Sequence, residues 1–167
     1  LLDDGTYEAL MSYVTSINVA CGAHAGDERM MRTMVKLAKK KNVKIGAHPS
    51  YPDRENFGRF DLDISDEELT NSISDQIVCL INIAAEQNCS INHVKPHGAL
   101  YNSAARNEKL ATLIGDVIKS IDPSLPIMCL AGSQMVKTLK LMGMKVLPES
   151  FADRTYEPDG SLRKRTY

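Results

Sequence analysis

Short apolar runs alternate along the chain with longer segments in which apolar residues recur at every third or fourth position. The short runs, rich in β-branched residues, predict strands at residues 14–21, 43–48, 91–95, 127–130 and 145–147. The periodic segments predict helices over residues 27–41, from 65 through 84, over 107–121 and over 133–142. Because a strand–helix–strand crossover returns the chain in the same direction, this alternation predicts an α/β protein with a parallel sheet.

Local signals mark the ends of these helices. Asp27 stands at the expected N-cap of the first predicted helix. Ser65 and Glu68 form a capping-box pattern at the start of the second, and Gly143 follows the last helix as a C′ residue. Residues 49–63 contain two prolines, a glycine and several charges, which predict a long loop of the kind that often carries function.

Polar and titratable side chains gather at one end of the predicted strands. Five parallel strands form either an open doubly wound sheet or most of a closed (β/α) barrel, and ligands bind at the carboxyl ends of the strands in both. The residues at or just past these ends are Asn18, His24 and Asp27, then His48, then Lys95, His97 and Asn102, and finally Glu149, Asp153 and Arg154. Chance would scatter such residues over both ends of the sheet, so their gathering at one rim favours an enzyme.

Several of these residues also have an ordinary structural interpretation. His24 lies between small residues before a helix, where it can fill space, although its neighbours favour a site. Asp27 is better explained as a helix cap than as a catalytic acid. His48, held extended by the proline that follows it, suits either an aimed ligand or an ordinary strand end. His93 lies within its strand and is interpreted as a buried core histidine.

The run Lys95-Pro96-His97-Gly98 is harder to explain as structure alone. A lysine that ends a buried strand is costly to desolvate unless an anion meets it. Gly98 lets the backbone approach a ligand closely, and His97 supplies a proton carrier that works near neutral pH. The run therefore suits a substrate oxyanion or phosphoryl group that is handled with acid–base help.

The composition narrows the range of functions. The chain has 167 residues with 20 basic and 21 acidic side chains, and a net charge of −1. This length predicts a single domain, residues 1–167, and the balance of charge argues against binding to nucleic acid or to anionic membranes. No apolar run approaches the roughly 20 residues of a membrane span, and no secretory signal opens the chain, so we expect a cytoplasmic protein. Its four cysteines form no C-x-x-C pair, which is typical of reduced packing residues.

Familiar nucleotide-binding and hydrolase motifs are missing. The sequence contains no G-x-x-x-x-G-K-[ST] loop, no G-x-G-x-x-G turn and no G-x-S-x-G elbow. Any nucleotide is therefore held outside the two usual phosphate cradles.

Five segments carry a resemblance to a known family along nearly the whole chain. They are Ser16–Asp27 (SINVACGAHAGD), Ile45–Asp53 (IGAHPSYPD), Phe57–Arg59 (FGR), His93–Asn102 (HVKPHGALYN) and Phe151–Tyr156 (FADRTY). In these segments the chain resembles the LamB/YcsF proteins, which form the A subunits of bacterial ATP-dependent 5-oxoprolinases. It departs from the family at Ala23, where phenylalanine is usual, and at Ser50, where glycine is frequent.

The resemblance implies an irregular seven-stranded (β/α) barrel, TIM-like and of the glycoside hydrolase/deacetylase type. The Asn-x-Asp-x-Gly-Glu signature of the family's first strand is not found in this sequence, so we expect a barrel that is incomplete at both termini. The implied activity is cleavage of the lactam of 5-oxo-L-proline to L-glutamate, driven by ATP together with Mg²⁺. The implied partners are two further 5-oxoprolinase subunits, B and C.

The rim residues fit this chemistry. Phosphorylation of the lactam oxygen would make its carbonyl electrophilic, and Lys95 and Arg154 are candidate cations for the phosphoryl charge. His97 or Asp153 is the candidate base for water attack, and His24 the candidate proton donor for ring opening. Arg59, or the turn before the helix at residue 27, is suited to the substrate carboxylate. The other expected substrate-binding residues are Asn18, His48, Asn102 and Glu149.

Two rival interpretations stay open at this point. The first is a metal-dependent deacetylase of small acylated carbohydrates, with His24, His48, His97 and Asp27 around zinc or a similar ion, although no H-x-x-x-H pair supports it. Whether a divalent metal is bound is likewise open. The second is a non-catalytic scaffold subunit, which buried histidines and a cleft plugged by side chains would favour.

Overall fold

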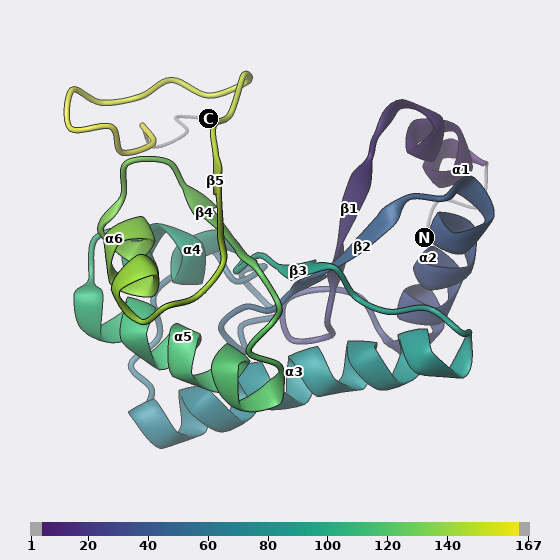
Figure 1. Ribbon diagram of the computed structural model, residues 1–167, viewed down its shortest axis with the longest axis horizontal. Helices are drawn as coiled ribbons and strands as arrows, with labels where there is room; N and C mark the ends of the chain where they lie inside the picture. Colours follow the sequence, from purple (N-terminus) through teal and green to yellow (C-terminus); the bar gives the residue numbers. More distant parts are fainter. Residues whose placement is uncertain (1–4, 164–167) are drawn as a thin grey trace.

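The structure, a computed structural model, describes residues 5–163 and contains one sheet with helices packed against it (Figure 1). Its strands are β1 (Ser16–Ala20), β2 (Lys44–His48), β3 (His93–Val94), β4 (Ile127–Leu130) and β5 (Val146–Glu149). Its helices are α1 (Thr6–Leu10), the 3-10 helix η1 (Met11–Tyr13), α2 (Glu28–Lys41), α3 (Asp66–Glu86), α4 (Gly98–Ala104), α5 (Glu108–Ile121) and α6 (Gln134–Leu141). The predicted α/β fold with a parallel sheet is confirmed.

The sheet winds in a single direction. Its strand order is β1-β2-β3-β4-β5, and every neighbouring pair is parallel. A doubly wound sheet reverses its order at a switch point, whereas a (β/α) barrel keeps the chain order and carries its helices outside. Helices α2, α3, α5 and α6 lie along the outer, convex side of the curved sheet (Figure 1). This winding is consistent with a TIM-like barrel, and five strands lie within residues 5–163.

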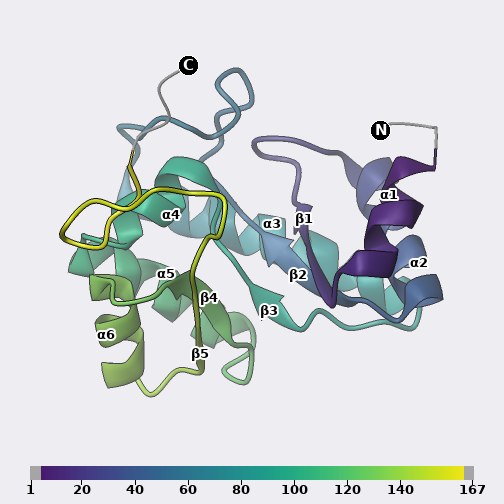
Figure 2. The ribbon, with the colours of Figure 1, turned by 90° about the horizontal axis from the view of Figure 1, so that it is seen from above.

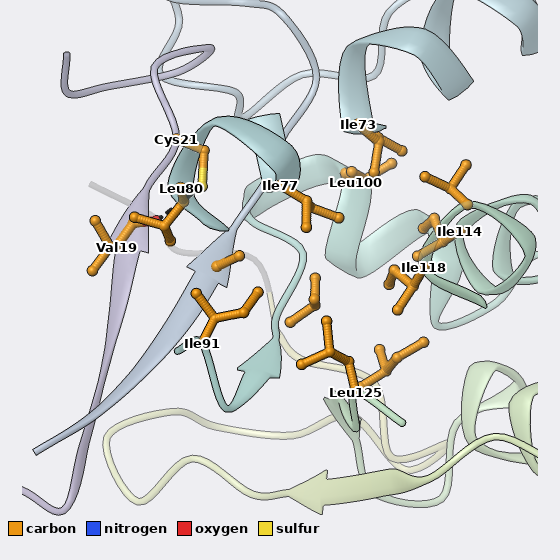
Figure 3. Packing of buried hydrophobic residues seen from close by; sticks show 14 of the residues in the cluster. Val19, Cys21, Ile73, Ile77, Leu80, Ile91, Leu100, Ile114, Ile118 and Leu125 are labelled. Carbon is orange, nitrogen blue, oxygen red and sulfur yellow. Dashed lines mark hydrogen bonds between the residues drawn. The ribbon is translucent and has the colours of Figure 1, made fainter. Parts of the chain in front are cut away.

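The core lies between the convex side of the sheet and its helices. Figure 3 shows Val19 of β1 on one side of this core and Ile73, Ile77 and Leu80 of α3 facing it. The three α3 side chains are fully buried, as is Ile114 of α5. Because the apolar residues of each strand point to the helices, the alternate residues of β1, β2 and β3 are left to face the concave side. Those alternate positions hold the polar residues of the site.

Helix starts match the sequence signals closely. Asp27 caps α2 by accepting a hydrogen bond from the Met30 amide at 2.7 Å, and Ser65 caps α3 in a complete capping box. Asp27 therefore serves as a helix cap, as the sequence predicts. Gly143 follows α6 with a φ of 76°, a left-handed conformation typical of a C′ residue.

The strand limits and the short helices differ from the prediction. β1 begins at Ser16, two residues later than predicted, and β3 is only two residues long. β5 includes Glu149, and its Pro148 is tolerated because β5 lies at the end of the strand order. Helix α4 is not predicted by the sequence: it has seven residues, begins with a glycine, and its N-cap makes no side-chain hydrogen bond. Helices α1 and η1 also lack a side-chain cap.

The loops that leave β1, β2 and β5 all lie on the same side of the sheet (Figure 2). The segment between β2 and α3 contains no helix or strand, as its prolines and charges predict. Within residues 5–163, no helix has the length and apolar character that crossing a membrane requires. All four cysteines are free thiols.

Candidate active site

Three imidazoles meet at the carboxyl ends of the first three strands. His24 follows β1, His48 ends β2, and His97 follows β3. The rings of His24 and His97 are stacked, with centroids 3.9 Å apart and planes 7° from parallel. His48 meets both edge-on, at 5.7 Å from His24 and 4.8 Å from His97. We call these three residues the imidazole cluster.

Hydrogen bonds fix the orientation of each ring. His48 Nδ1 lies 2.6 Å from the Lys95 carbonyl oxygen, and His48 Nε2 lies 3.0 Å from His97 Nδ1. His97 Nε2 lies 2.9 Å from the Phe57 carbonyl oxygen. His24 Nδ1 lies 2.9 Å from Ser50 Oγ. Five of the six ring nitrogens of the cluster therefore have a partner within residues 5–163, and His24 Nε2 has no such hydrogen bond there.

The loop between β2 and α3 covers the imidazole cluster. The Phe57 ring packs edge-on against His24 at 5.3 Å and against His97 at 5.2 Å. Gly58 lies so close that a Cβ there would stand 3.1 Å from the His24 Cβ and 3.2 Å from the His97 Cδ2. Arg54 ties this loop down by donating to the carbonyl oxygens of Gly22 and Gly26. His24 is consequently only 2% exposed.

Burial lowers the pKa of all three imidazoles of the cluster. Loss of hydration lowers the pKa of His24 from 6.5 to about 4, helped by the proximity of His97 and Arg54. The same cause lowers the pKa of His48 from 6.5 to about 3, although its bond to the Lys95 carbonyl acts in the opposite sense. The pKa of His97 is also lowered, again mainly by desolvation. Neutral imidazoles can accept protons, which is what a general base must do.

The lowered pKa of His24 predicts a pH-dependent stability. An unfolded chain takes up a proton on this imidazole near pH 6.5, whereas the folded protein does so only near pH 4. The unfolded state therefore binds more protons between these values, and the free energy of unfolding falls as the pH falls. We expect a loss of about 2 kcal/mol from this group between pH 7 and pH 5, measured by urea unfolding. His24→Gln should have a shallower pH dependence; a slope equal to that of the wild type would contradict the assignment.

A second group of polar residues surrounds the Lys95 ammonium. Lys95 Nζ lies 2.8 Å from Glu149 Oε2, which joins the ends of β3 and β5. The ammonium also lies 4.8 Å from the centroid of the Phe151 ring and 5.7 Å from that of Tyr101. The Tyr101 hydroxyl and Glu149 Oε1 are buried without a hydrogen bond of good geometry within residues 5–163. Burial and the nearby carboxylate raise the pKa of Tyr101, so its hydroxyl keeps its proton.

Asn18 of β1 and His93 of β3 form a pair within the sheet, before the strand ends that carry the imidazole cluster. His93 Nε2 lies 2.9 Å from Asn18 Oδ1, and His93 is 2% exposed. The ring lies directly over Gly46, where any Cβ would clash with the His93 imidazole. His93 is thus the satisfied core histidine that the sequence predicts. It also holds the expected substrate-binding residue Asn18.

The remaining predicted site residues are exposed or half-buried. Arg59 is exposed and stacks over the Phe57 ring at 5.3 Å. Asn102 lies exposed on α4, and Asp153 lies exposed in the segment after β5. Arg154 donates through Nη2 to the Arg163 carbonyl oxygen at 2.8 Å. The fold thus brings together His24, His48, His97, Lys95 and Glu149, and Arg59 lies beside Phe57 at the edge of this group.

The imidazole cluster is not arranged as a metal centre. In the part of the chain from residue 5 to 163, no three His, Cys, Asp or Glu side chains form a group that could hold a metal ion. Five of the six ring nitrogens of the cluster lie within hydrogen-bond distance of another residue, and Asp27 caps α2. These residues therefore do not fit the zinc site of the deacetylase interpretation.

Two cavities open nearby, and neither is lined by the imidazoles. One, of about 510 Å³, is lined by Cys21, Ala23, Glu68, Asn71, Ser72, Asp75 and Gln76. The other, of about 540 Å³, lies between the N-terminal helices and Arg54. Within the cluster His24 is buried, whereas His48 and His97 are partly exposed. A substrate would reach His24 past these two rings or after displacement of Phe57.

Sequence reasoning missed several residues that shape the site. Phe57, Ser50 and Gln76 contact or support the imidazoles from the loop and from α3, and Tyr101 with Phe151 encloses the Lys95 ammonium. Ser50 and Phe57 lie within segments that carry the family resemblance, which was the available signal. Gln76 lies mid-helix on a buried position, where a polar residue is itself a clue to a partner.

Comparisons with known proteins agree with the fold. A family model described as the LamB/YcsF family matches residues 3–167. A relative from Haemophilus influenzae (strain PittEE), named as the A subunit of 5-oxoprolinase, is 46% identical over 159 residues, covering 95% of this chain and 65% of the relative. Relatives of the same name occur in Pyrococcus furiosus, at 46% identity over 97% of this chain and 64% of the relative, and in Neisseria meningitidis serogroup B, at 42% over 97% and 66%.

A solved structure is similar over the same extent. The crystal structure of the Lactam Utilization Protein from Thermus thermophilus matches with a TM-score of 0.90 and 36% sequence identity, covering 95% of this chain and 64% of that chain. The chain therefore spans a little less than two thirds of the length of the first relatives it matches. With the family model matched from residue 3 to residue 167, the chain belongs to the LamB/YcsF family.

Proposed function

We propose that this chain is the A subunit of an ATP-dependent 5-oxoprolinase, in which it contributes to opening the lactam of 5-oxo-L-proline to give L-glutamate. The observation that carries the proposal is the pairing of neutral imidazoles with a partly buried ammonium at one end of a parallel sheet. Relatives named as the A subunit of 5-oxoprolinase support the choice of a lactam over other amides.

The chemistry of a lactam explains the need for ATP. Amide resonance deactivates the ring carbonyl, and transfer of the γ-phosphoryl group to its oxygen removes that protection. A water oxygen then bonds to the carbonyl carbon, the ring C–N bond breaks, and the nitrogen takes a proton. The acyl phosphate left behind reacts with a second water to give glutamate and phosphate. In this scheme Mg²⁺ accompanies ATP as its counter-ion.

The site residues have distinct roles in this scheme. Lys95, with Arg154 as a second candidate, stabilises the negative charge of the phosphoryl group. His97, or Asp153, accepts a proton from the attacking water. His24 has a pKa near 4 and so takes up a proton before it can give one to the ring nitrogen. The sequence suggests that His24 is a proton donor. In this scheme His24 first accepts a proton and then donates it to the ring nitrogen.

Other rim residues are suited to binding the substrate. Arg59 is exposed beside Phe57, where its guanidinium can pair with the substrate carboxylate. Asn18, His48, Asn102 and Glu149 keep their proposed binding roles. The proposed partners are the B and C subunits, and the proposed location is the cytoplasm.

A scaffold role is the second candidate, and a specific observation favours it. His24 is 2% exposed and Phe57 covers the imidazole cluster, which is the plugged arrangement expected of a non-catalytic subunit. Under this alternative the imidazoles only hold together the loops after β1, β2 and β3. The two candidates predict different responses to substitution within the cluster.

The test is reconstitution with the partner subunits and measurement of ATP-dependent glutamate release from 5-oxoproline. We expect turnover to require this chain and to fall about 100-fold in His97→Gln, because general acid–base groups contribute about 10²–10⁴-fold. Lys119→Ala, an exposed position on α5, is the matched control and should turn over like the wild type. Unchanged turnover in a folded His97→Gln protein would favour the scaffold role, and turnover without this chain would refute both.

A further inference from the structure

The Ser50 hydroxyl has only one favourable position for its hydrogen. Ser50 Oγ lies 2.7 Å from the Tyr51 carbonyl oxygen and 2.9 Å from His24 Nδ1. A carbonyl oxygen only accepts, and a hydroxyl has one hydrogen to donate. If that hydrogen pointed to His24, two oxygens would face each other at 2.7 Å with no proton between them. Ser50 therefore donates to Tyr51 and accepts from His24 Nδ1–H.

Gln76 holds Ser50 in this position from the middle of α3. Its side-chain amide makes a two-point clamp on the Ser50 backbone: Oε1 accepts from the Ser50 amide at 2.9 Å, and Nε2 donates to the Ser50 carbonyl at 2.9 Å. Nε2 also donates to the Ser72 carbonyl and approaches Ser72 Oγ, both at 3.1 Å. Ser50 is 0% exposed and Gln76 is 6% exposed, so water does not compete for these bonds.

We propose that Ser50, clamped by Gln76, is a positioning residue that holds His24 in the Nδ1–H tautomer and thereby leaves His24 Nε2 available to accept a proton. Nε2 is the one nitrogen of the imidazole cluster without a hydrogen bond to a residue in the range 5–163. In a neutral imidazole one nitrogen carries the proton and the other a lone pair. The buried hydrogen bonds from Gln76 of α3 to Ser50, and from His24 to Ser50, thus determine which ring nitrogen of His24 can accept a proton.

The groups around His24 are compatible with this assignment. His97 stacks on one face of the ring, His48 and Phe57 meet it edge-on, and Arg54 adds positive charge from the covering loop. Burial, His97 and the Arg54 guanidinium all disfavour a positive charge on His24. The ring stays neutral at pH 7, and its tautomer is set by Ser50. The catalytic part of the inference rests on the proposed function, whereas the tautomer does not.

The tautomer is measured by nuclear magnetic resonance on the full chain labelled with ¹⁵N-histidine. Ring nitrogens that carry a proton and those that do not have well-separated ¹⁵N shifts, and His24→Gln identifies the His24 signals among the four histidines. At pH 7 we expect a protonated Nδ1 and a bare Nε2. The reverse pattern in the wild-type protein would overturn the inference without any variant.

Three serine variants separate the hydroxyl from general effects on the structure. Ser50→Ala removes only the acceptor of the His24 bond, and we expect a substantial population of the Nε2–H form. Ser50→Thr keeps the hydroxyl and should restore the wild-type signals. Ser72→Ala is the matched control: it removes a hydroxyl that contacts Gln76 but not His24, so the His24 signals should not move. An unchanged tautomer in Ser50→Ala would refute the role of Ser50.

Turnover in the reconstituted complex then tests the catalytic part. We expect Ser50→Ala to lower kcat at least about tenfold with little change in KM, and Ser50→Thr to recover most of it. A shifted tautomer with unchanged kcat would leave Ser50 as the tautomer-setting residue but refute His24 as a base. If His24 carries its proton on Nε2 while the complex still opens the lactam, this inference is refuted and the proposed function stands.

Discussion

Replacement of Lys95 by methionine is expected to lower ATP-dependent lactam turnover in the reconstituted complex at least about a thousandfold, the range found for cations that stabilise a transferring phosphoryl group. The same substitution leaves Glu149 without its cation in a site where the two side chains are only 13% and 19% exposed. Glu149 Oε1 already has no hydrogen bond of good geometry within residues 5–163. We therefore also expect a loss of about 3 kcal/mol in the free energy of unfolding, measured by urea denaturation.

A double variant separates these two effects. In Lys95→Met/Glu149→Gln the uncompensated carboxylate is gone, so much of the lost stability should return. Turnover should not return, because the ammonium is still absent. Turnover that recovers together with stability would mean that Lys95 serves only to neutralise Glu149. His97→Gln in the same assay provides the comparison, since it changes the imidazole cluster and leaves this ion pair intact.

Gly98→Ala is expected to destabilise the protein by about 3 kcal/mol or more, because the left-handed conformation costs a residue with a Cβ about 1–2 kcal/mol and overpacking adds about 1–3 kcal/mol. Gly98 has a φ of +57°, and a Cβ there would overlap the Gly58 carbonyl oxygen. The oxygen cannot move away freely, because it accepts a hydrogen bond from the Ala99 amide at 2.9 Å. Displacing it would also pull Phe57 away from His97, so turnover should fall as well.

Gly143→Ala is the matched control for this substitution. Gly143 has a φ of +76°, and a Cβ there would have no neighbour within 4 Å. It shares the left-handed backbone of Gly98 without the close approach, so we expect a loss of only about 1 kcal/mol. Thermal or urea unfolding of both variants measures the difference. Equal losses at the two positions would show that the close approach of residues 58 and 98 does not affect the free energy of unfolding.

The regular elements of this fold follow from short-range signals. β4 has the predicted limits because its apolar run is bounded by turn residues, and the α2 and α3 starts follow from Asp27 and Ser65. Helix α4 could not be predicted in the same way. It has only seven residues, and tertiary contacts of Gly98 and Ala99 with the covering loop fix its beginning. β3 covers only His93 and Val94, although the amides of Asn92 and Lys95 on either side also donate to the carbonyl oxygens of Ile45 and Ala47 in β2.

The candidate site was predictable in outline and not in its contacts. The rule that strand ends meet at one side of a parallel sheet places His24, His48, His97 and Lys95 together. It cannot tell that Glu149 binds the Lys95 ammonium, because that depends on side-chain direction between strands that are not neighbours. Nor can it tell that the loop after β2 closes over the imidazoles.

Because the strands pair in their sequence order, the parts of the site can form one after another during folding. Each strand pairs only with the strands that precede and follow it, so every pairing closes a loop that contains one or two helices, and short closures cost little entropy. The imidazoles of His24, His48 and His97 lie at or just after the ends of β1, β2 and β3, and the loop that covers them lies between β2 and α3. They can come together before β5 pairs with β4. Lys95 acquires the carboxylate of Glu149 only when β5 is in place, so this ion pair depends on a later pairing than the imidazole cluster does.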